Sequence, residues 1–284
     1  MSILVDLNQV LIANLMQQIN YDPKMKLDEN LIRHMVLNSL RSYSKQFKSK
    51  YGDLVICCDS KTYWRREYFP FYKANRKKDR EKSNLDWNLI FQTLNKIRDE
   101  LKTNFPYRVL EIEGAEADDI IGVLAARLSS SEDILILSSD KDFAQLQKYS
   151  SVSQYSPILK RFIKNENPLS YLKEHIIRGD RGDGVPNFLS SDNVFVIGER
   201  QKVINKKRLT EWINSNYTEF CVTDTMLRGY KRNQTLVDLD YTPETIKSKI
   251  VDAYDNTKPS SRQKLLTYFI ENRLKNLIPI IDEF

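Results

Sequence analysis

The stretch YRVLEIEGAEADDIIGVLAARLSSSEDILILSSDKDF, residues 107–143, decides the fold that this sequence predicts. It has the pattern of a strand, a helix and a second strand, separated by charged and turn-forming residues. Alternation of this kind favours right-handed βαβ units and a mainly parallel sheet. Acidic residues stand where these strands end and where the helix begins. Because the carboxyl ends of parallel strands share one edge of a sheet, we expect the acids to meet there.

Outside this stretch, further carboxylates follow the same pattern. The run ILVDL ends near Asp6, DLVICCD ends in Asp59, and the loop RGDRGDGVP holds another pair. Each acid taken alone could be a helix cap or a turn residue, but five clusters argue against that reading for the set. The full candidate set is Asp6, Asp59, Glu116, Asp118, Asp119, Asp140, Asp142, Asp180 and Asp183.

A cluster of this kind needs a cation. Two carboxylates about 4 Å apart repel each other by roughly 4 kcal/mol at an effective dielectric constant near 20. A bound metal ion removes this repulsion, and ligands that are all oxygen favour Mg²⁺ or Mn²⁺. The sequence therefore predicts a divalent metal site at the edge of the sheet.

The spacing of apolar residues predicts the remaining elements and a division of the chain near residue 165. An α/β domain with a mainly parallel central sheet flanked by helices is expected over residues 1–165, and a smaller helical domain over residues 166–284. Strands are predicted at 2–7, 53–58, 107–112 and 133–138. Helices are predicted at 28–48, 85–103, 116–128, 141–148, 169–178, 207–215, 242–254 and 259–273.

Composition indicates a soluble protein of the reducing cytoplasm. The 284 residues are 41% hydrophobic and 29% charged, which suits a chain with a large core and a polar surface. The sequence has no apolar run of about 18 residues, so we expect no membrane span. No secretory leader is apparent at the N-terminus. The three cysteines do not form a disulfide framework. His34 and His175 lack zinc-binding spacing, so we expect both to be structural or surface residues.

The positive charge of the chain is concentrated in residues 61–82, KTYWRREYFPFYKANRKKDREK. This segment holds nine Lys or Arg against three Asp or Glu, a net charge of +6 that equals the net charge of the whole chain. It also holds six aromatic residues. Basic side chains match phosphates and aromatic rings can stack on unpaired bases, so nucleic acid is the expected partner. In the alternative interpretation, aromatic residues such as Phe69 and Phe71 simply pack on the core.

These residues carry a resemblance to the structure-specific 5′-nuclease, or flap endonuclease, superfamily, and within it to the ribonuclease H group of the T-even bacteriophages. The resemblance runs from Ile3 to the terminal IDEF. Its strongest blocks are ICCDSKTYWRREYFPFYKANR, EADD, LILSSDKDF and the RGDRGD loop. EADD alone would be a weak signal, whereas the four blocks in this order are specific. The fold implied is the α/β fold of these nucleases with a helical DNA-binding C-terminal domain.

The resemblance also implies roles for the acids. One metal would be held mainly by Asp59, Glu116, Asp118, Asp140 and Asp142, with Asp119 as a supporting group. The second metal site would be completed by Asp6, Asp180 and Asp183, partly through water. Two Mg²⁺ or Mn²⁺ ions would activate water and stabilise the leaving 3′ oxygen, giving a 5′-phosphate and a 3′-hydroxyl.

The basic segment, about 61–84, resembles the family's arch, which guides a 5′ single strand. Lys73 and Arg76 would approach the scissile phosphate and, with Asp118 and Asp142, would be catalytic. Tyr72 could stack on a base. The nucleic-acid-binding set implied is Arg65, Arg66, Tyr72, Lys73, Arg76, Lys77, Lys78 and Arg80. One departure is that GVPNFLSSDNVFVIGERQK lacks the Gly-rich turn with which many relatives grip duplex DNA and hold a monovalent ion.

The function implied is a metal-dependent 5′-to-3′ exonuclease and flap endonuclease that removes RNA primers during phage DNA replication. Flap, branched or nicked DNA and RNA–DNA hybrid would be its substrates, and a single-strand-binding protein and a sliding clamp its partners. The chain would act as a monomer in the cytoplasm of an infected bacterium. Two alternatives are a non-catalytic DNA-binding replication protein and a haloacid-dehalogenase-like phosphatase. The phosphatase needs a second aspartate two residues after Asp6, where this chain has Asn8.

Overall fold

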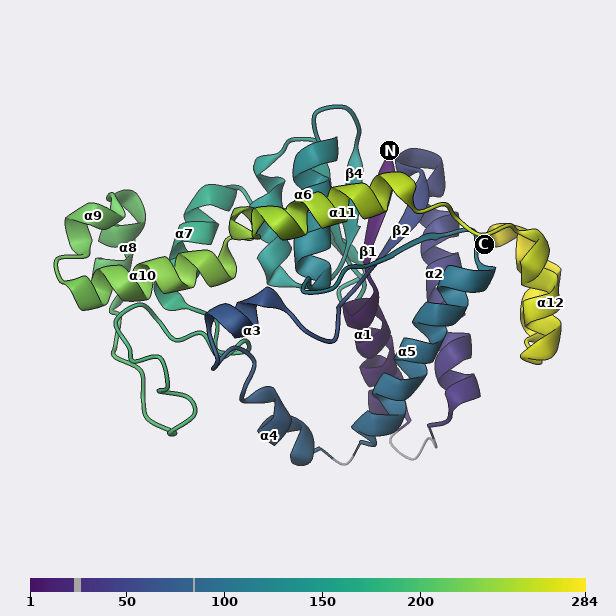
Figure 1. Cartoon of the computed structure of the whole chain (residues 1–284), viewed down its shortest axis with the longest axis horizontal. Coiled ribbons are helices and arrows are strands. Elements are labelled where there is room, and N and C mark those ends of the chain that lie inside the picture. Colours follow the sequence, from purple (N-terminus) through teal and green to yellow (C-terminus); the bar gives the residue numbers. More distant parts are fainter. Residues whose placement is uncertain (23–26, 84) are drawn as a thin grey trace.

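A six-stranded sheet forms the centre of the computed structural model, which describes residues 1–22, 27–83 and 85–284, with the side chains of 77–79 also outside the description. The strand order is β3-β2-β1-β4-β5-β6, and β6 alone runs antiparallel to its neighbour. Figure 1 shows helices on both sides of this sheet. The strands are β1 (Ser2–Asp6), β2 (Asp53–Cys58), β3 (Arg108–Glu111), β4 (Ile134–Leu137), β5 (Val152–Ser156) and β6 (Arg161–Ile163). The expected mainly parallel sheet is therefore confirmed.

Helices cover the two faces of the sheet because side chains alternate along each strand. In β1, Ile3 and Val5 contribute to one hydrophobic core and Leu4 to the other. The first face is covered by α1 (Leu7–Tyr21), α2 (Glu29–Tyr51) and α5 (Trp87–Asn104). From the C-terminus, α12 (Gln263–Glu271) packs against α5 and the 3₁₀ segment η3 (Lys275–Glu283) against α2, and both extend the same hydrophobic core. The second face is covered by α6 (Ala117–Leu128), the 3₁₀ segment η1 (Lys141–Lys148) and α11 (Glu244–Asn256).

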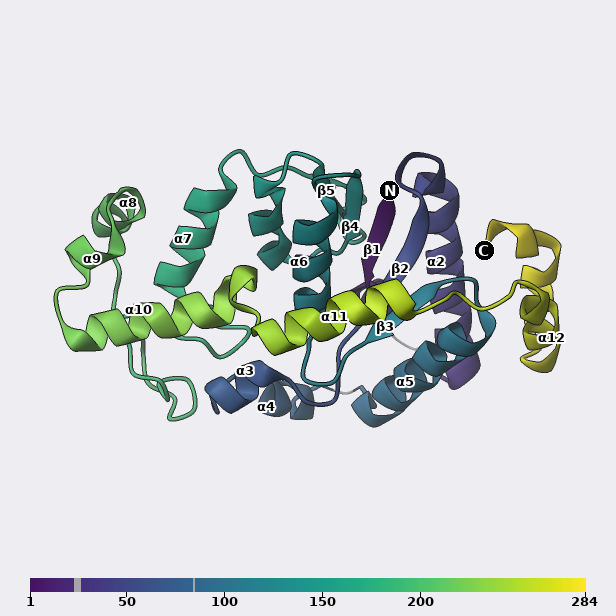
Figure 2. The same ribbon diagram turned by 45° about the horizontal axis from the view of Figure 1, so that its top comes forward.

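The described residues beyond 165 form helices and 3₁₀ segments joined by loops, as the sequence predicts, but the helices lie in two places. One group builds a third core around Phe188 and Tyr230. It comprises α7 (Pro168–Arg178), α8 (Lys206–Asn214), α9 (Tyr217–Phe220) and α10 (Asp224–Val237), followed by η2 (Leu239–Tyr241). The other group returns to the α/β part of the molecule, where α11 lies beside the sheet, as Figure 2 shows, and α12 packs against α5. The boundary near residue 165 stays a prediction.

The basic segment forms two short helices that leave the sheet after β2, α3 (Trp64–Tyr68) and α4 (Arg76–Glu81). Its apolar residues Phe69 and Tyr72 are buried in a small cluster with Val185 and Leu236. Phe71 packs against that cluster. Core packing, the alternative interpretation of these aromatic residues, is therefore what the structure shows.

Several elements differ from the sequence prediction. Helices α1 and α10 and strands β5 and β6 were not predicted, and the helix expected at 141–148 is a 3₁₀ helix. The helix expected at 259–273 begins only at Gln263. No helix in the described part of the chain is long and apolar enough to cross a membrane.

Candidate metal and nucleic-acid site

The carboxyl ends of β2, β1 and β4 lie side by side, and an acid follows each strand. Asp6 ends β1 and caps α1, because its Oδ1 accepts a hydrogen bond from the backbone N–H of Gln9 at 3.1 Å. Asp59 follows β2, Asp140 follows β4, and Asp118 stands in the first turn of α6. These four carboxylates line an open pocket of about 720 Å³, which we call the acid pocket. The structure thus brings together acids from distant parts of the sequence, of which Asp6 and Asp140 are 134 positions apart.

Hydrogen bonds fix the orientation of two of these carboxylates. Asp59 accepts from the Asn8 Nδ2 at 2.9 Å and from the backbone N–H of Ala117 at 2.8 Å. Asp6 accepts from the Ser138 hydroxyl at 3.1 Å. Asn8, whose type counted against a phosphatase in the sequence, therefore positions a carboxylate of the site.

Two carboxylates of the acid pocket are difficult to ionise because they are buried beside other carboxylates. Burial, with the nearby carboxylates Asp59 and Asp140, raises the pKa of Asp6 to about 7. Burial and Asp140 likewise raise the pKa of Asp118 well above its ordinary value. Carboxylates that are this costly to ionise together are what a divalent cation would stabilise. The donor set, oxygen throughout, fits Mg²⁺ or Mn²⁺.

A second group lies beside the pocket, where η1 meets α7 and the loop after it. Asp142, His175 and Asp180 each offer one ligand atom, and these atoms lie within 4.8 Å of one another. Nε2 of His175 lies 3.2 Å from Oδ2 of Asp180, and its Nδ1 lies 3.6 Å from Oδ1 of Asp142. Lys141 also pairs with Asp180, at 2.7 Å. His175, expected from the sequence to be an ordinary structural residue, is thus in direct contact with two candidate metal ligands.

The charges of this second group are partly balanced. Burial, and next the charge of Asp140, raise the pKa of Asp142 to about 7, although His175 acts against the shift. Burial favours the neutral form of Asp180, but hydrogen bonds from His175 and Lys141 hold its pKa below the usual range. Burial also opposes the charged form of His175, yet its contacts with Asp180 and Asp142 raise the pKa of the imidazole.

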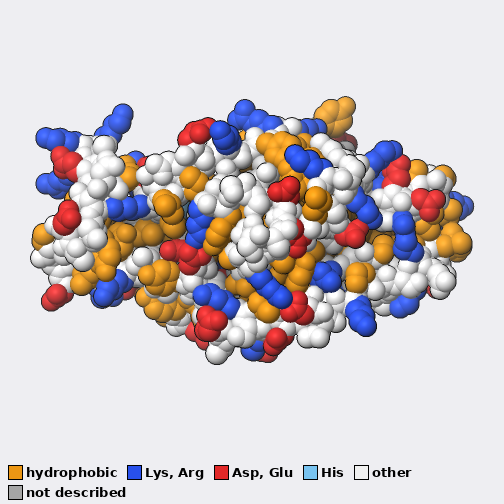
Figure 3. Space-filling view, turned by 90° about the horizontal axis from the view of Figure 1, so that it is seen from above, with side chains coloured by type: hydrophobic (Ala, Val, Ile, Leu, Met, Phe, Trp, Pro, Cys, Tyr) orange, Lys and Arg blue, Asp and Glu red, His pale blue; other side chains and the backbone are white. Residues whose placement is uncertain are grey.

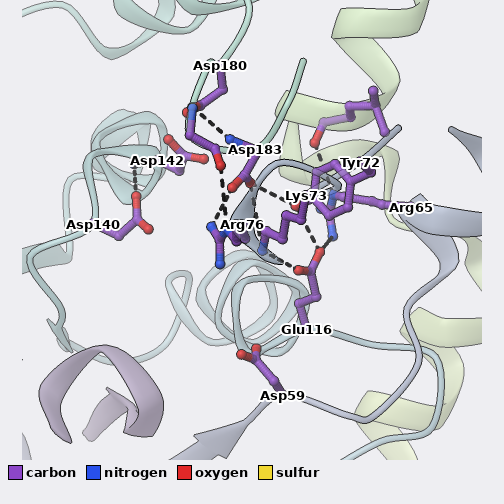
Figure 4. Close-up of polar contacts among 12 residues, drawn as sticks. Asp59, Arg65, Tyr72, Lys73, Arg76, Glu116, Asp140, Asp142, Asp180 and Asp183 are labelled. Atoms are coloured by element: carbon purple, nitrogen blue, oxygen red, sulfur yellow. Dashed lines mark hydrogen bonds and ion pairs between the residues drawn. The ribbon is translucent and has the colours of Figure 1, made fainter. Parts of the chain in front are cut away.

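Two further acids, Glu116 and Asp183, are held by the basic segment (Figure 4). Lys73 Nζ lies 2.5 Å from Glu116. The Tyr72 hydroxyl lies 3.1 Å from a carboxylate oxygen of Glu116 and 2.9 Å from one of Asp183, and it can donate its single proton to either. Arg76 pairs with Asp183 at 2.5 Å. Lys73 has a left-handed backbone conformation, φ 56°, and its N–H donates to the Asp183 carbonyl at 2.7 Å. The basic segment is therefore joined at this point to the loop that holds Asp180 and Asp183.

Three residues occupy places other than those expected for ligand or substrate contacts. Asp119 is fully buried, and its carboxylate accepts hydrogen bonds from Trp64, Arg65, Thr242 and the backbone of Glu116. Arg65 is 2% exposed and its guanidinium pairs with Asp119 and Glu116, so it is not free to contact a phosphate. Tyr72 is also 2% exposed, which leaves no ring face open for a base.

Other basic residues of the arch do face the acid pocket. Lys73, Arg66, Arg76 and Arg80 line it. The Arg66 guanidinium lies over the Tyr63 ring at 5.4 Å, and that of Arg80 over a phenylalanine of α5 at 5.2 Å. The side chains of Lys77 and Lys78 lie outside the described residues, so their predicted contacts stay predictions. The pocket thus combines carboxylates with a basic side that matches a phosphate backbone.

The raised pKa values predict that the metal-free protein loses stability as the pH rises from about 4 to about 7. The folded-state pKa of Asp6 and of Asp142 is about 7, against an ordinary 3.8, so the folded state binds more protons than the unfolded state between these values. Stability from this source is complete below pH 4 and lost above pH 7. For a chain of this size, a loss of 1 kcal/mol in the free energy of unfolding lowers the melting temperature by about 2–4 °C. We therefore expect the melting temperature in EDTA to fall by about 5 °C or more between pH 5 and pH 8.

Melting curves of three proteins check this prediction. Asp6→Asn should show a smaller fall in melting temperature than the parent, and the exposed Asp99→Asn should behave like the parent. Millimolar Mg²⁺ or Mn²⁺ should raise the melting temperature of the parent at pH 8 again, because a ligand bound only by the folded state stabilises that state. A melting temperature that rises from pH 5 to pH 8 in EDTA would contradict the crowding of acids described above.

One known protein resembles this chain over nearly its full length, and another resembles half of it. Residues 3–175 match the family model of the 5'-3' exonuclease N-terminal resolvase-like domain, and residues 170–284 match that of the T4 RNase H C-terminal domain. The ribonuclease H of Enterobacteria phage T4 is 36% identical over 292 residues, which cover 99% of this chain and 95% of the phage protein. A 5'-3' exonuclease of Buchnera aphidicola subsp. Schizaphis graminum is 34% identical over 152 residues, 50% of each chain.

Solved structures with the same fold come from T5 nucleases. A structure of T5 5'-exonuclease with divalent metal ions (zinc) bound has a TM-score of 0.65 and 16% sequence identity, and covers 91% of this chain and 99% of its own. A complex of T5 D15 flap endonuclease with DNA and metal ions has a TM-score of 0.62 at 16% identity, covering 89% and 98%. At this identity the two structures show a shared fold.

Proposed function

The chain belongs to the 5'-3' exonuclease family and is a nuclease, and from this premise we propose that it is a metal-dependent 5′-to-3′ exonuclease and flap endonuclease. Its substrates are flap, branched or nicked DNA and RNA–DNA hybrid, and its cofactors are two Mg²⁺ or Mn²⁺ ions. The observation that carries the proposal is the acid pocket. There, Asp6, Asp59, Asp118 and Asp140 share one cavity with basic arch residues.

The carboxylates would hold the metal ions, and the ions would supply an activated water and neutralise charge on the leaving 3′ oxygen. Asn8 and the N-terminus of α6 orient Asp59, so that this ligand keeps its position without rearrangement. Lys73 and Arg76 line the pocket and pair with two further acids, Glu116 and Asp183. With metal ions bound to the acids, these two cations would be available to neutralise charge that develops on the phosphate.

The basic side of the acid pocket supports the expected path of the 5′ strand. Arg66 and Arg80 extend the charge of Lys73 and Arg76 along the arch. Contacts of this type go to the phosphates and not to base edges, so RNA or DNA could occupy the strand that is cut. Residues 166–284 would bind the duplex. Lys and Arg side chains gather at the end of the molecule formed by α8 and α9, which is at the left of Figure 3.

In the cell, the enzyme would remove RNA primers during phage DNA replication, in the cytoplasm of the infected host. Support comes from the similarity to the ribonuclease H of phage T4 across 95% of that protein. A monomer that works beside a single-strand-binding protein and a sliding clamp fits this role. Family membership sets aside both the phosphatase and the non-catalytic DNA-binding protein.

The proposal is tested with a DNA duplex that carries a 5′ flap labelled at its 5′ end. In Mg²⁺ we expect release of labelled oligonucleotides that end in a 3′-hydroxyl, and the same from an RNA primer annealed to DNA. Excess EDTA should stop release, whereas 4-nitrophenyl phosphate should not be hydrolysed. Intact flaps after incubation with folded protein and Mg²⁺ would overturn the proposal.

A further inference from the structure

His175 lies in the last turn of α7, and the surrounding structure holds its imidazole in one place. The side chain is 7% exposed. Tyr171, one turn earlier, meets the imidazole edge-on with 6.1 Å between ring centres. Both ring nitrogens face carboxylates, Nε2 towards Asp180 and Nδ1 towards Asp142. A nitrogen donor is therefore fixed between two oxygen donors.

A second observation indicates that this group has an open ligand position. Oδ1 of Asp142 is buried, yet it has no hydrogen-bond partner within the described part of the chain. It faces Nδ1 of His175 at 3.6 Å, which is longer than a hydrogen bond. A buried carboxylate oxygen without a partner is costly, so the site is complete only when a further group reaches this oxygen.

We infer that His175 is a direct metal ligand, which together with Asp142 and Asp180 makes this position selective for Mn²⁺ or another transition metal over Mg²⁺. The inference rests on the proposed metal-dependent function and specifies one of its two metal positions. Neutral imidazole is a common ligand of transition metals, while Mg²⁺ takes oxygen ligands and water. The acid pocket, lined by carboxylates, has no such nitrogen donor among its described lining residues.

Metal binding at this position requires only small changes in the protein. Lys141 is the other cation on Asp180, and its side chain is 57% exposed. It can move into solvent when a metal takes its place. His175 and Asp180 already have donor atoms 3.2 Å apart, a separation that two neighbouring ligands of one ion can have. The alternative role for His175 is a protonated bridge that pairs with both carboxylates and never touches the metal.

The chain offers a clean spectroscopic test because it contains two histidines. Untagged protein is loaded with Mn²⁺, and electron spin-echo envelope modulation detects ¹⁴N coupled to the bound ion. We expect a ¹⁴N coupling of imidazole type in the parent, and its replacement by a ¹⁵N pattern in protein labelled with ¹⁵N-histidine. This measurement needs no mutation, so it remains valid even if a His175 variant fails to fold.

Variants then assign the signal to one residue. His175→Gln should lose the coupling and bind Mn²⁺ at one site roughly 10-fold or more weakly, the scale on which changes around a metal site are felt. Its affinity for Mg²⁺ should not fall. The matched control is His34→Gln, since His34 lies on α2 and contacts Asn38 at 2.8 Å. This control should keep both the coupling and the Mn²⁺ affinity.

The outcomes separate this inference from the proposed function. Bound Mn²⁺ without any ¹⁴N coupling overturns the ligand role of His175, and metal-dependent flap cleavage by the same sample would leave the proposed function intact. A coupling that disappears in His175→Gln supports the inference whatever the substrate proves to be. A coupling that persists in His175→Gln overturns it.

Discussion

Replacing Asp118 by Asn is expected to lower kcat on a 5′-flap substrate by roughly 10³-fold, the scale seen when one group that stabilises the transition state is lost. Asp118 stands in the first turn of α6 and lines the acid pocket. Burial and Asp140 raise its pKa, which means that its charge is costly in the metal-free protein. The substitution should therefore leave the melting temperature in EDTA unchanged or higher, while the affinity for Mn²⁺ falls.

The control for this prediction is Asp53→Asn. Asp53 is an exposed residue at the amino end of β2, opposite the end that leads to Asp59. The Asp53→Asn variant should cleave the flap substrate at the parental rate. Turnover by Asp118→Asn within threefold of the parent, in saturating Mg²⁺, would exclude Asp118 from the metal site and require a different ligand set.

Replacing Lys73 by Ala is expected to lower kcat by roughly 10²-fold even at saturating substrate, because we propose that its charge stabilises the phosphate being cut. Lys73 Nζ lies among the acids, 2.5 Å from Glu116 and 3.7 Å from Asp183. Arg80→Ala should behave differently, since Arg80 lies further along the arch, over the ring of Phe91. We expect it to weaken flap binding and to lower the slope of log Kd against log salt by about 0.7.

The distinction follows from where each charge acts. A cation that only guides the strand stabilises the ground state and the transition state alike, so it changes affinity and not kcat. Single-turnover rates and salt-dependent Kd values for both variants measure the difference. Lys45→Ala, on the exposed face of α2, is the control for loss of one positive charge. Equal losses of kcat in Lys73→Ala and Arg80→Ala would show that the arch has no separate guiding role.

Much of the central sheet could be predicted because its strands are continuous apolar runs that are buried on both faces. The unpredicted β5 and β6 lie at the edge, where the pattern is weaker. Gln154 in β5 is 1% exposed, and its amide donates to the carbonyls of Ser138 and Asp140. A buried polar residue in a strand breaks the apolar pattern, and only the tertiary structure supplies its hydrogen-bond partners.

The same reason explains the unpredicted helix α10. Arg232 and Asn233 stand in its middle and are buried, where an apolar face would be expected. Their side chains donate to backbone carbonyls of the loop after α7, including that of Pro186. The periodicity of the helix is therefore hidden by residues that the structure uses to hold a loop.

Most acids of the site could be found from the sequence because they follow a strand or open a helix, and Asp180 and Asp183 because they form a pair in one loop. Their partners could not. Arg65 and Tyr72 appear in the sequence as part of a basic, aromatic segment, but the structure turns both inwards to Glu116. His175 lies five residues before Asp180, at the end of a helix that leads into the acidic loop. This spacing was the available signal, but it gains meaning only when η1 brings Asp142 to the same place.

The central claim is that carboxylates gathered at the sheet edge hold the metal ions with which this nuclease cuts its substrate. It is tested most directly by the single-turnover rate of flap cleavage as Mg²⁺ is titrated into protein freed of metal with EDTA. We expect no cleavage without metal and a rise in rate that is steeper than first order in Mg²⁺, as two ions require. Cleavage at the full rate in excess EDTA would contradict the claim.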